Sequence, residues 1–136
     1  MKGSELDDYR RGKMYERGLG GFPQDFPKAM ECFRRVADEQ NHPGAQFTLS
    51  MMLFLKWLIL LDDTDYEEGK KWLYRAEDQG FGEAVELKSS FDKFDRNPSP
   101  HTRKHFMRML REYLGMTGME KSNWRVFFEQ MSDISP

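Results

Sequence analysis

Two segments of this chain carry the same pattern of residues, and they lie 40 positions apart. The shared positions are Asp25, Lys28, Ala29, Cys32, Phe33 and Val36 in the first segment, and Asp65, Glu68, Gly69, Trp72, Leu73 and Ala76 in the second. Repetition at a period of roughly 20–50 residues is typical of proteins built from stacked supersecondary units. The repeat therefore predicts like units packed side by side.

Each segment has the pattern of an amphipathic helix followed by a turn. Its apolar or small residues recur at three- and four-residue steps, so they share one helix face. Asp25 and Asp65 stand where a carboxylate can accept hydrogen bonds from the free amides of a helix start. Asn41 and Gly80 tolerate the left-handed backbone that ends a helix, so the chain can reverse there and begin a second helix. Each unit is thus predicted to be a helical hairpin.

The same signals predict an all-α fold of one domain. Helices are expected near residues 4–18, 26–40, 45–61, 66–79, 83–94, 101–115 and 122–132. Residues 124–128 (Trp-Arg-Val-Phe-Phe) also fit a short strand, and the pattern leaves that alternative open. The breaker at 97–100 (Asn-Pro-Ser-Pro) separates a repeat body, residues 1–96, from a C-terminal pair of helices, residues 97–136, which we expect to cap the stack.

A wider set of residues fits one known family. In the first unit these residues are Gly12, Tyr15, Gly18, Gly20, Asp25, Lys28, Ala29, Phe33, Ala37 and Ala45, and in the second Leu49, Asp65, Trp72, Ala76, Gly80 and Ala84. The pattern resembles the Sel-like branch of the tetratricopeptide-type α/α repeats over about residues 9–90. The second unit lacks the family's Gly-x-Gly loop. The resemblance implies a helical-hairpin solenoid of about two Sel-like repeats that binds protein partners and is not an enzyme by virtue of the repeat.

The predicted helix 45–61 is apolar on two sides. One stripe, suited to the core of the repeat, is Leu49, Leu53, Trp57 and Leu60. The other is Met51, Phe54, Leu55 and Leu58. Either neighbouring helices cover both sides, or the second stripe lines a groove for a partner segment.

An acidic turn follows this helix. It contains Asp62, Asp63 and Asp65 next to Tyr66. The turn is either a solvated helix start or an acidic patch that steers a partner with a basic surface. The candidate partner-binding residues are therefore Met51, Phe54, Leu55, Leu58, Asp62, Asp63, Asp65 and Tyr66.

The chemistry-bearing residues elsewhere form only weak patterns. His101 and His105 would share a helix face, but Arg103 and Lys104 lie between them and would repel a metal cation. Cys32 neighbours a core position, which favours a packed thiol over a nucleophile. The glycines at 18–21 follow no strand and precede no Lys-Ser/Thr pair, so a turn explains them better than a phosphate loop. We expect no catalytic residue, no metal and no cofactor.

Composition limits the compartment and the partners. A single cysteine allows no internal disulfide, so the cytoplasm is the default expectation. The apolar run 51–61 is shorter than a membrane helix and is interrupted by Lys56, so we expect no membrane association. Of 21 basic and 23 acidic residues in the chain, 6 and 4 lie in residues 97–136. That difference is too small to predict nucleic-acid binding from charge alone.

The sequence thus predicts a non-enzymatic protein–protein interaction module, in the form of a monomer or weak homodimer. A dedicated inhibitor or a toxin-neutralising immunity protein is one specific form of this hypothesis. The alternative is a nucleic-acid-binding protein that uses Lys104, Arg108 and Arg111, which share one face of a C-terminal helix.

Overall fold

All regular structure in the described residues is helical. The structure is a computed structural model that describes residues 2–116, 119 and 123–134, with the side chains of residues 8–116, 119 and 123–132. The helices are α1 (Lys2–Arg17), α2 (Phe26–Glu39), α3 (Pro43–Leu60), α4 (Asp63–Asp78), α5 (Gly82–Arg96), α6 (Pro100–Met116) and α7 (Trp124–Ile134). The predicted helices are confirmed in order and approximate bounds. The alternative of a strand at 124–128 is wrong, because those residues begin α7.

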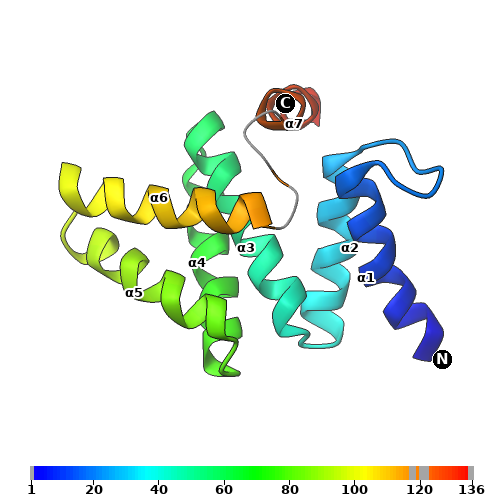
Figure 1. Cartoon of the computed structure of the whole chain (residues 1–136), viewed down its shortest axis with the longest axis horizontal. Helices are drawn as coiled ribbons and strands as arrows, with labels where there is room; N and C mark the ends of the chain where they lie inside the picture. The colour runs from blue at the N-terminus through cyan, green and yellow to red at the C-terminus, as the bar shows by residue number, and fades with distance from the viewer. Residues whose placement is uncertain (1, 117–118, 120–122, 135–136) are drawn as a thin grey trace.

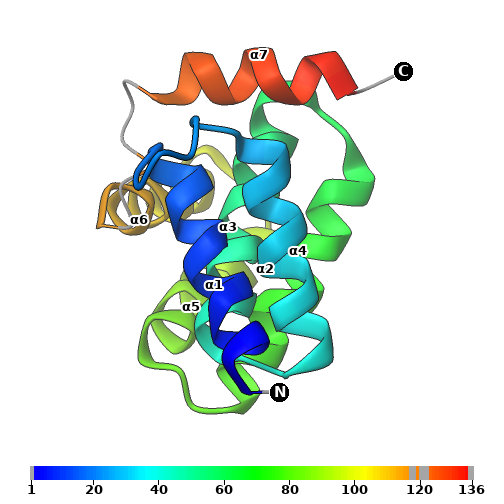
Figure 2. The same ribbon diagram turned by 90° about the vertical axis from the view of Figure 1, so that its right-hand side faces the viewer.

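From α1 to α6, each helix packs against the next one along the chain. Helices α1 to α4 run up and down beside one another, whereas α5 and α6 cross them (Figure 1). Helix α7 lies across one end of the molecule, against α2 and α3 (Figure 2). Helix α3 is therefore the central element, since it contacts α2, α4, α6 and α7.

The helix starts are partly those that the sequence predicts. The Asp25 carboxylate accepts a hydrogen bond from the amide of Lys28 at 3.0 Å, and so caps α2 as expected. At α4 the capping residue is Asp62, not Asp65, because α4 begins three residues earlier than predicted. Asn41 (φ 50°) and Gly80 (φ 77°) have the predicted left-handed backbone.

The close approach of α3 and α4 depends on one glycine. A Cβ atom at Gly69 would lie 3.1 Å from the ring of Phe54, so only a hydrogen fits there without displacing the ring. The Ser50 hydroxyl donates a 2.7 Å hydrogen bond to the Gly69 carbonyl across the same seam. Phe54 continues the core toward the C-terminal helices, with ring centroids 5.1 Å from Phe91 and 5.4 Å from Phe106. Helices α3, α4, α5 and α6 thus share one aromatic core.

Two turns of the body are joined by side-chain amides, of which Gln46 is buried. The Gln46 side-chain amide donates to the Asn41 side chain at 2.8 Å and to the Ala37 carbonyl at 3.1 Å. The side-chain amide of Gln79, at the end of α4, donates to the side-chain oxygen Oε1 of Gln46 at 2.8 Å. This network links the turn between α2 and α3 to the turn after α4.

Helix α7 is fixed to the start of α2. The Phe127 and Phe26 rings meet edge to face at 5.2 Å. The Gln130 side chain accepts a hydrogen bond from the Phe26 amide at 2.7 Å and donates one to the Gln24 carbonyl at 2.9 Å. The last described helix therefore closes onto an early part of the chain.

Helix α3 is long and apolar enough to span a membrane by length and composition alone. However, 61% of its 18 residues are buried against the rest of the molecule. Such burial is that of a core helix.

Candidate functional site

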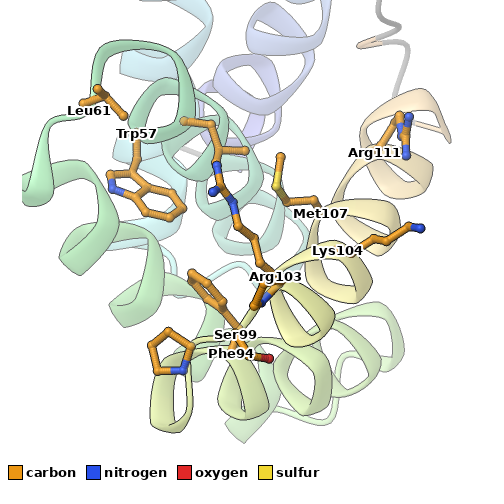
Figure 3. Close-up of a pocket in the computed structure, with 11 residues that line it drawn as sticks. Trp57, Leu61, Phe94, Ser99, Arg103, Lys104, Met107 and Arg111 are labelled. Carbon is orange, nitrogen blue, oxygen red and sulfur yellow. The ribbon is translucent and has the colours of Figure 1, made fainter.

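A groove runs along the C-terminal half of α3, between that helix, the end of α5 and α6. Its volume is about 800 Å³. Its lining residues are Trp57, Leu58, Leu61, Phe94, Pro98, Ser99, Pro100, Arg103, Lys104, Met107 and Arg111. In Figure 3, Trp57 and Phe94 form one wall of the groove and Met107 extends from the α6 wall.

A second cavity of about 330 Å³ adjoins the first. The two share Leu58, Met107 and Arg111 in their linings, and we refer to the two adjoining cavities together as the α3–α6 groove. Toward α7 the groove is lined additionally by Leu55, Ile59, Leu110, Leu114 and Trp124. Its floor is therefore almost entirely apolar.

The groove is open because the turn between α5 and α6 sets the two helices across α3. Ser99 and Thr102 exchange capping hydrogen bonds of 3.0–3.1 Å at the start of α6, which fixes where that helix begins. Residues 45–55 of α3 are buried, whereas residues 56–60 are only half-buried. Leu61, which follows the helix, is 77% exposed and has left-handed backbone (φ 59°). A leucine in this conformation is strained relative to glycine.

Among the described residues, the charged part of the lining is entirely basic. Arg103, Lys104 and Arg111 are exposed, and no described aspartate or glutamate lines either cavity. The Arg103 side chain extends across the mouth toward α3, whereas Lys104 and Arg111 point away from it along the α6 rim (Figure 3). None of the three side chains makes a hydrogen bond or ion pair within the part of the chain that the structure describes.

Two of the predicted partner-binding residues are inaccessible, which corrects the sequence hypothesis. Met51 and Phe54 are 0% exposed, and the Phe54 ring packs against the rings of Tyr66, Phe91 and Phe106. Leu55 is 2% exposed but lines the α7 end of the groove. Leu58, one turn later, is half-buried and does line the groove.

The acidic turn separates into residues with different roles. Asp62 and Asp63 are exposed, and Thr64 donates to the Asp62 carboxylate from its hydroxyl (2.7 Å) and its amide (2.9 Å), which lowers the pKa of Asp62. Asp65 is buried and pairs with Lys56 at 3.2 Å, although burial still raises its pKa. The structure therefore does not bring these carboxylates together as one surface patch.

Tyr66 faces the interior. Its ring lies 4.7 Å from the Trp57 ring, and its hydroxyl donates a short hydrogen bond to Asp95. Burial and that carboxylate raise the pKa of Tyr66. Tyr66 thus supports the wall of the groove from behind and is not itself a lining residue.

The sequence reasoning missed most of the groove. The helical periodicity assigned Trp57 to the core-facing stripe of its helix. No sequence pattern marked Phe94 or Met107 as binding residues. A signal was present on α6, where Arg103, Met107 and Arg111 recur at four-residue steps and so share one face. The position of that face opposite Leu58 and Leu61 depends on the crossing of α5 and α6.

The remaining candidate residues lie elsewhere. His101 and His105 line a pocket of about 130 Å³ with Ser90, Lys93 and Thr102, and the Ser90 hydroxyl lies 2.9 Å from His105 Nδ1. Ser90 is 2% exposed, and the pocket has room for little more than a few water molecules. The described residues contain no group of three His, Cys, Asp or Glu side chains arranged to hold a metal. Burial raises the pKa of the Cys32 thiol, which is packed beside α1 and 2% exposed.

One carboxylate is buried on α1 without a hydrogen bond. Glu16 is 1% exposed, and neither of its side-chain oxygens has a hydrogen-bond partner. Lys13 lies 3.9 Å away. Burial raises the pKa of Glu16 to about 7. This carboxylate is remote in sequence from the α3–α6 groove and lines neither of its cavities.

No protein-family model, curated protein or solved structure matches this chain.

Proposed function

We propose that this chain is a non-enzymatic protein-interaction module that holds a segment of a partner protein in the α3–α6 groove. The observation that carries the proposal is the cluster of accessible apolar side chains around one concavity, with Leu61 77% exposed at its edge. Monomeric proteins seldom leave large apolar side chains grouped in this way unless the surface binds something. The groove extends to Leu114 and Trp124, which gives room for a peptide rather than a single side chain.

We also propose that α1 to α4 are two Sel-like α/α hairpins stacked side by side. The equivalent ends of α2 and α4 support this proposal, because Asn41 and Gln79 both bond to Gln46. In this arrangement α5, α6 and α7 close the stack, and the binding groove forms where the second hairpin meets the closing helices.

The continuous apolar lining of the α3–α6 groove suits a single dedicated partner. An inhibitor of one enzyme or an immunity protein against one toxin would have this design. Neither form needs a catalytic group of its own.

Site-specific photo-crosslinking tests the groove as the binding surface. A benzophenone amino acid replaces Met107 inside the groove or, as the control, Val85, which is 45% exposed on α5 and lines no described pocket. In extract of the native host, we expect a discrete crosslinked protein from position 107 alone, and its loss when Leu61→Glu is added. Identical products from both positions, or none from position 107, would contradict the proposal. Circular dichroism and thermal melting check that each variant is folded.

Nucleic-acid binding is the alternative, and the basic α6 surface is the observation in its favour. Lys104, Arg108 and Arg111 are all exposed. A protein partner is favoured because bases stack on exposed aromatic faces, whereas the Phe94 ring is already stacked on Phe106 at 5.7 Å and the Trp57 ring lies 4.7 Å from the Tyr66 ring. A gel-shift assay at low salt with single-stranded and duplex DNA and RNA tests the alternative. We expect no shift.

A further inference from the structure

We infer that the segment held in the α3–α6 groove is acidic, with carboxylates placed beside its apolar anchors. This inference rests on the proposed function and adds the chemistry of the partner. The sequence alone suggested the opposite, a partner with a basic surface attracted by the acidic turn. The charges around the groove carry the new assignment.

The three cations of the groove differ from four cations elsewhere in the molecule that are paired with carboxylates. Arg34, Lys56, Lys70 and Lys88 each pair with a carboxylate of the chain at 2.9–3.2 Å. Arg103, Lys104 and Arg111 have no such partner among the described residues, and they gather around one apolar concavity. No described carboxylate of the chain pairs with these side chains, so a ligand carboxylate can pair with them. Charges at the rim of an apolar site direct which partners bind and in which register.

The spacing of the cations sets the shape of the ligand. Arg103 and Arg111 are eight residues apart on one helix, a rise of about 12 Å. Met107 lies between them on the same face and points into the groove (Figure 3). A matching segment therefore carries an apolar side chain for the groove, flanked by carboxylates about 12 Å apart. Such a segment satisfies the apolar floor and the basic rim together.

The acidic turn is less suited to bind a basic partner than the groove is to bind an acidic one. Asp65 is 5% exposed and already neutralised by Lys56. Asp62 accepts two hydrogen bonds at the start of α4, so its carboxylate has an internal role. Neither residue lines the groove. Basic side chains line the apolar groove itself, whereas the described carboxylates of the acidic turn do not line it.

The test uses a display library of random 16-residue peptides, selected on the folded full-length protein. Synthetic copies of the selected peptides are then titrated against wild type, Arg103→Glu/Arg111→Glu, Met107→Glu and Arg108→Glu. Arg108→Glu is the matched control, because Arg108 is exposed on α6 but lines neither cavity. We expect selected peptides rich in Asp and Glu as well as large apolar residues. Their Kd should rise roughly tenfold or more in the double charge reversal and remain within about twofold in the control.

The outcomes separate this inference from the proposed function. Two outcomes would overturn the inference of an acidic ligand but leave the groove as the binding site. In one, the selected peptides need Met107 for binding but are neutral or basic. In the other, they bind Arg103→Glu/Arg111→Glu as tightly as wild type. A failure of Met107→Glu to weaken any selected peptide would overturn the groove itself. The same library is also selected on Arg103→Glu/Arg111→Glu. Peptides rich in lysine and arginine from that selection would be the strongest support for the inference. A fluorescein-labelled single-stranded 12-mer DNA that binds through Arg103 and Arg111, with no peptide selected, would overturn the inference in favour of nucleic acid.

Discussion

The two halves of α3 have opposite environments, and the more polar half is the more deeply buried. Residues 45–55 include Gln46 and Ser50, yet every residue in this stretch is buried. The half from residue 56 onward contains Trp57 and Leu58 and remains half-exposed. Gln46 and Ser50 are tolerated inside because each has a hydrogen-bond partner. Neighbouring helices, not hydrophobicity along the sequence, decide which half is core and which half is surface.

Truncation of the buried half is expected to have the largest effect on stability. Phe54→Ala removes a ring that contacts Phe91 and Phe106, and should lower the free energy of unfolding by about 3–5 kcal/mol. Leu58→Ala, one turn later, should cost only about 1 kcal/mol, because less apolar surface leaves water at a half-buried site. Urea denaturation of the two variants measures the difference. Equal costs would remove the contrast between the halves.

Lys56 marks the boundary between the halves and is the next strongest test. Lys56→Met leaves Asp65 buried and unpaired, which should cost about 2–4 kcal/mol at pH 7. Replacing both residues, as Lys56→Met/Asp65→Leu, should recover most of that loss. The cost should also shrink at pH 4, since protonation neutralises a buried carboxylate whose pKa is raised. Unfolding curves at the two pH values check both expectations.

Glu16 shows what burial does to a carboxylate that has no hydrogen-bond partner. Burial raises the pKa of Glu16 from the ordinary glutamate value of 4.5 to about 7, so the folded state binds more protons than the unfolded state between these pH values. Stability therefore falls as pH rises from about 4.5 to about 7, and the full penalty remains above that range.

Glu16→Gln should remove this dependence. We expect a stabilisation of about 1–3 kcal/mol at pH 8 and almost none at pH 4. Glu31→Gln, at an exposed position of α2, is the matched control and should change little at either pH. A flat difference between wild type and Glu16→Gln across this range would show that Glu16 is not the titrating group.

Leu61 gives the smallest effect on stability and the clearest separation of folding from binding. Leu61→Gly relieves the left-handed backbone and should stabilise the protein by about 0.5–1 kcal/mol. The same change removes an apolar side chain from the edge of the groove and should weaken a groove-binding peptide. Asparagine also tolerates the left-handed conformation, so Leu61→Asn should likewise stabilise the protein and weaken the groove-binding peptide. A loss of stability in both variants would mean that Leu61 supports the fold and not the groove.

The sequence by itself determined the secondary structure and much of the core. Periodic apolar residues, the Asp25 cap and the Asn41 and Gly80 helix ends are local signals, so each can be identified from neighbouring residues. They predicted seven helices that the structure contains. The burial of Met51 and Phe54 was one of two alternatives that the same pattern left open.

Only the tertiary structure decided which apolar side chains are accessible. Periodicity shows that a helix has two apolar sides, but coverage depends on where α4, α5 and α6 cross it. That crossing covers Phe54, leaves Leu58 and Leu61 open, and places Arg103 beside them. It also separates Asp65 from the exposed carboxylates by pairing it with Lys56. A site formed by helices distant in sequence depends on their packing angles, and no local pattern of residues encodes those angles.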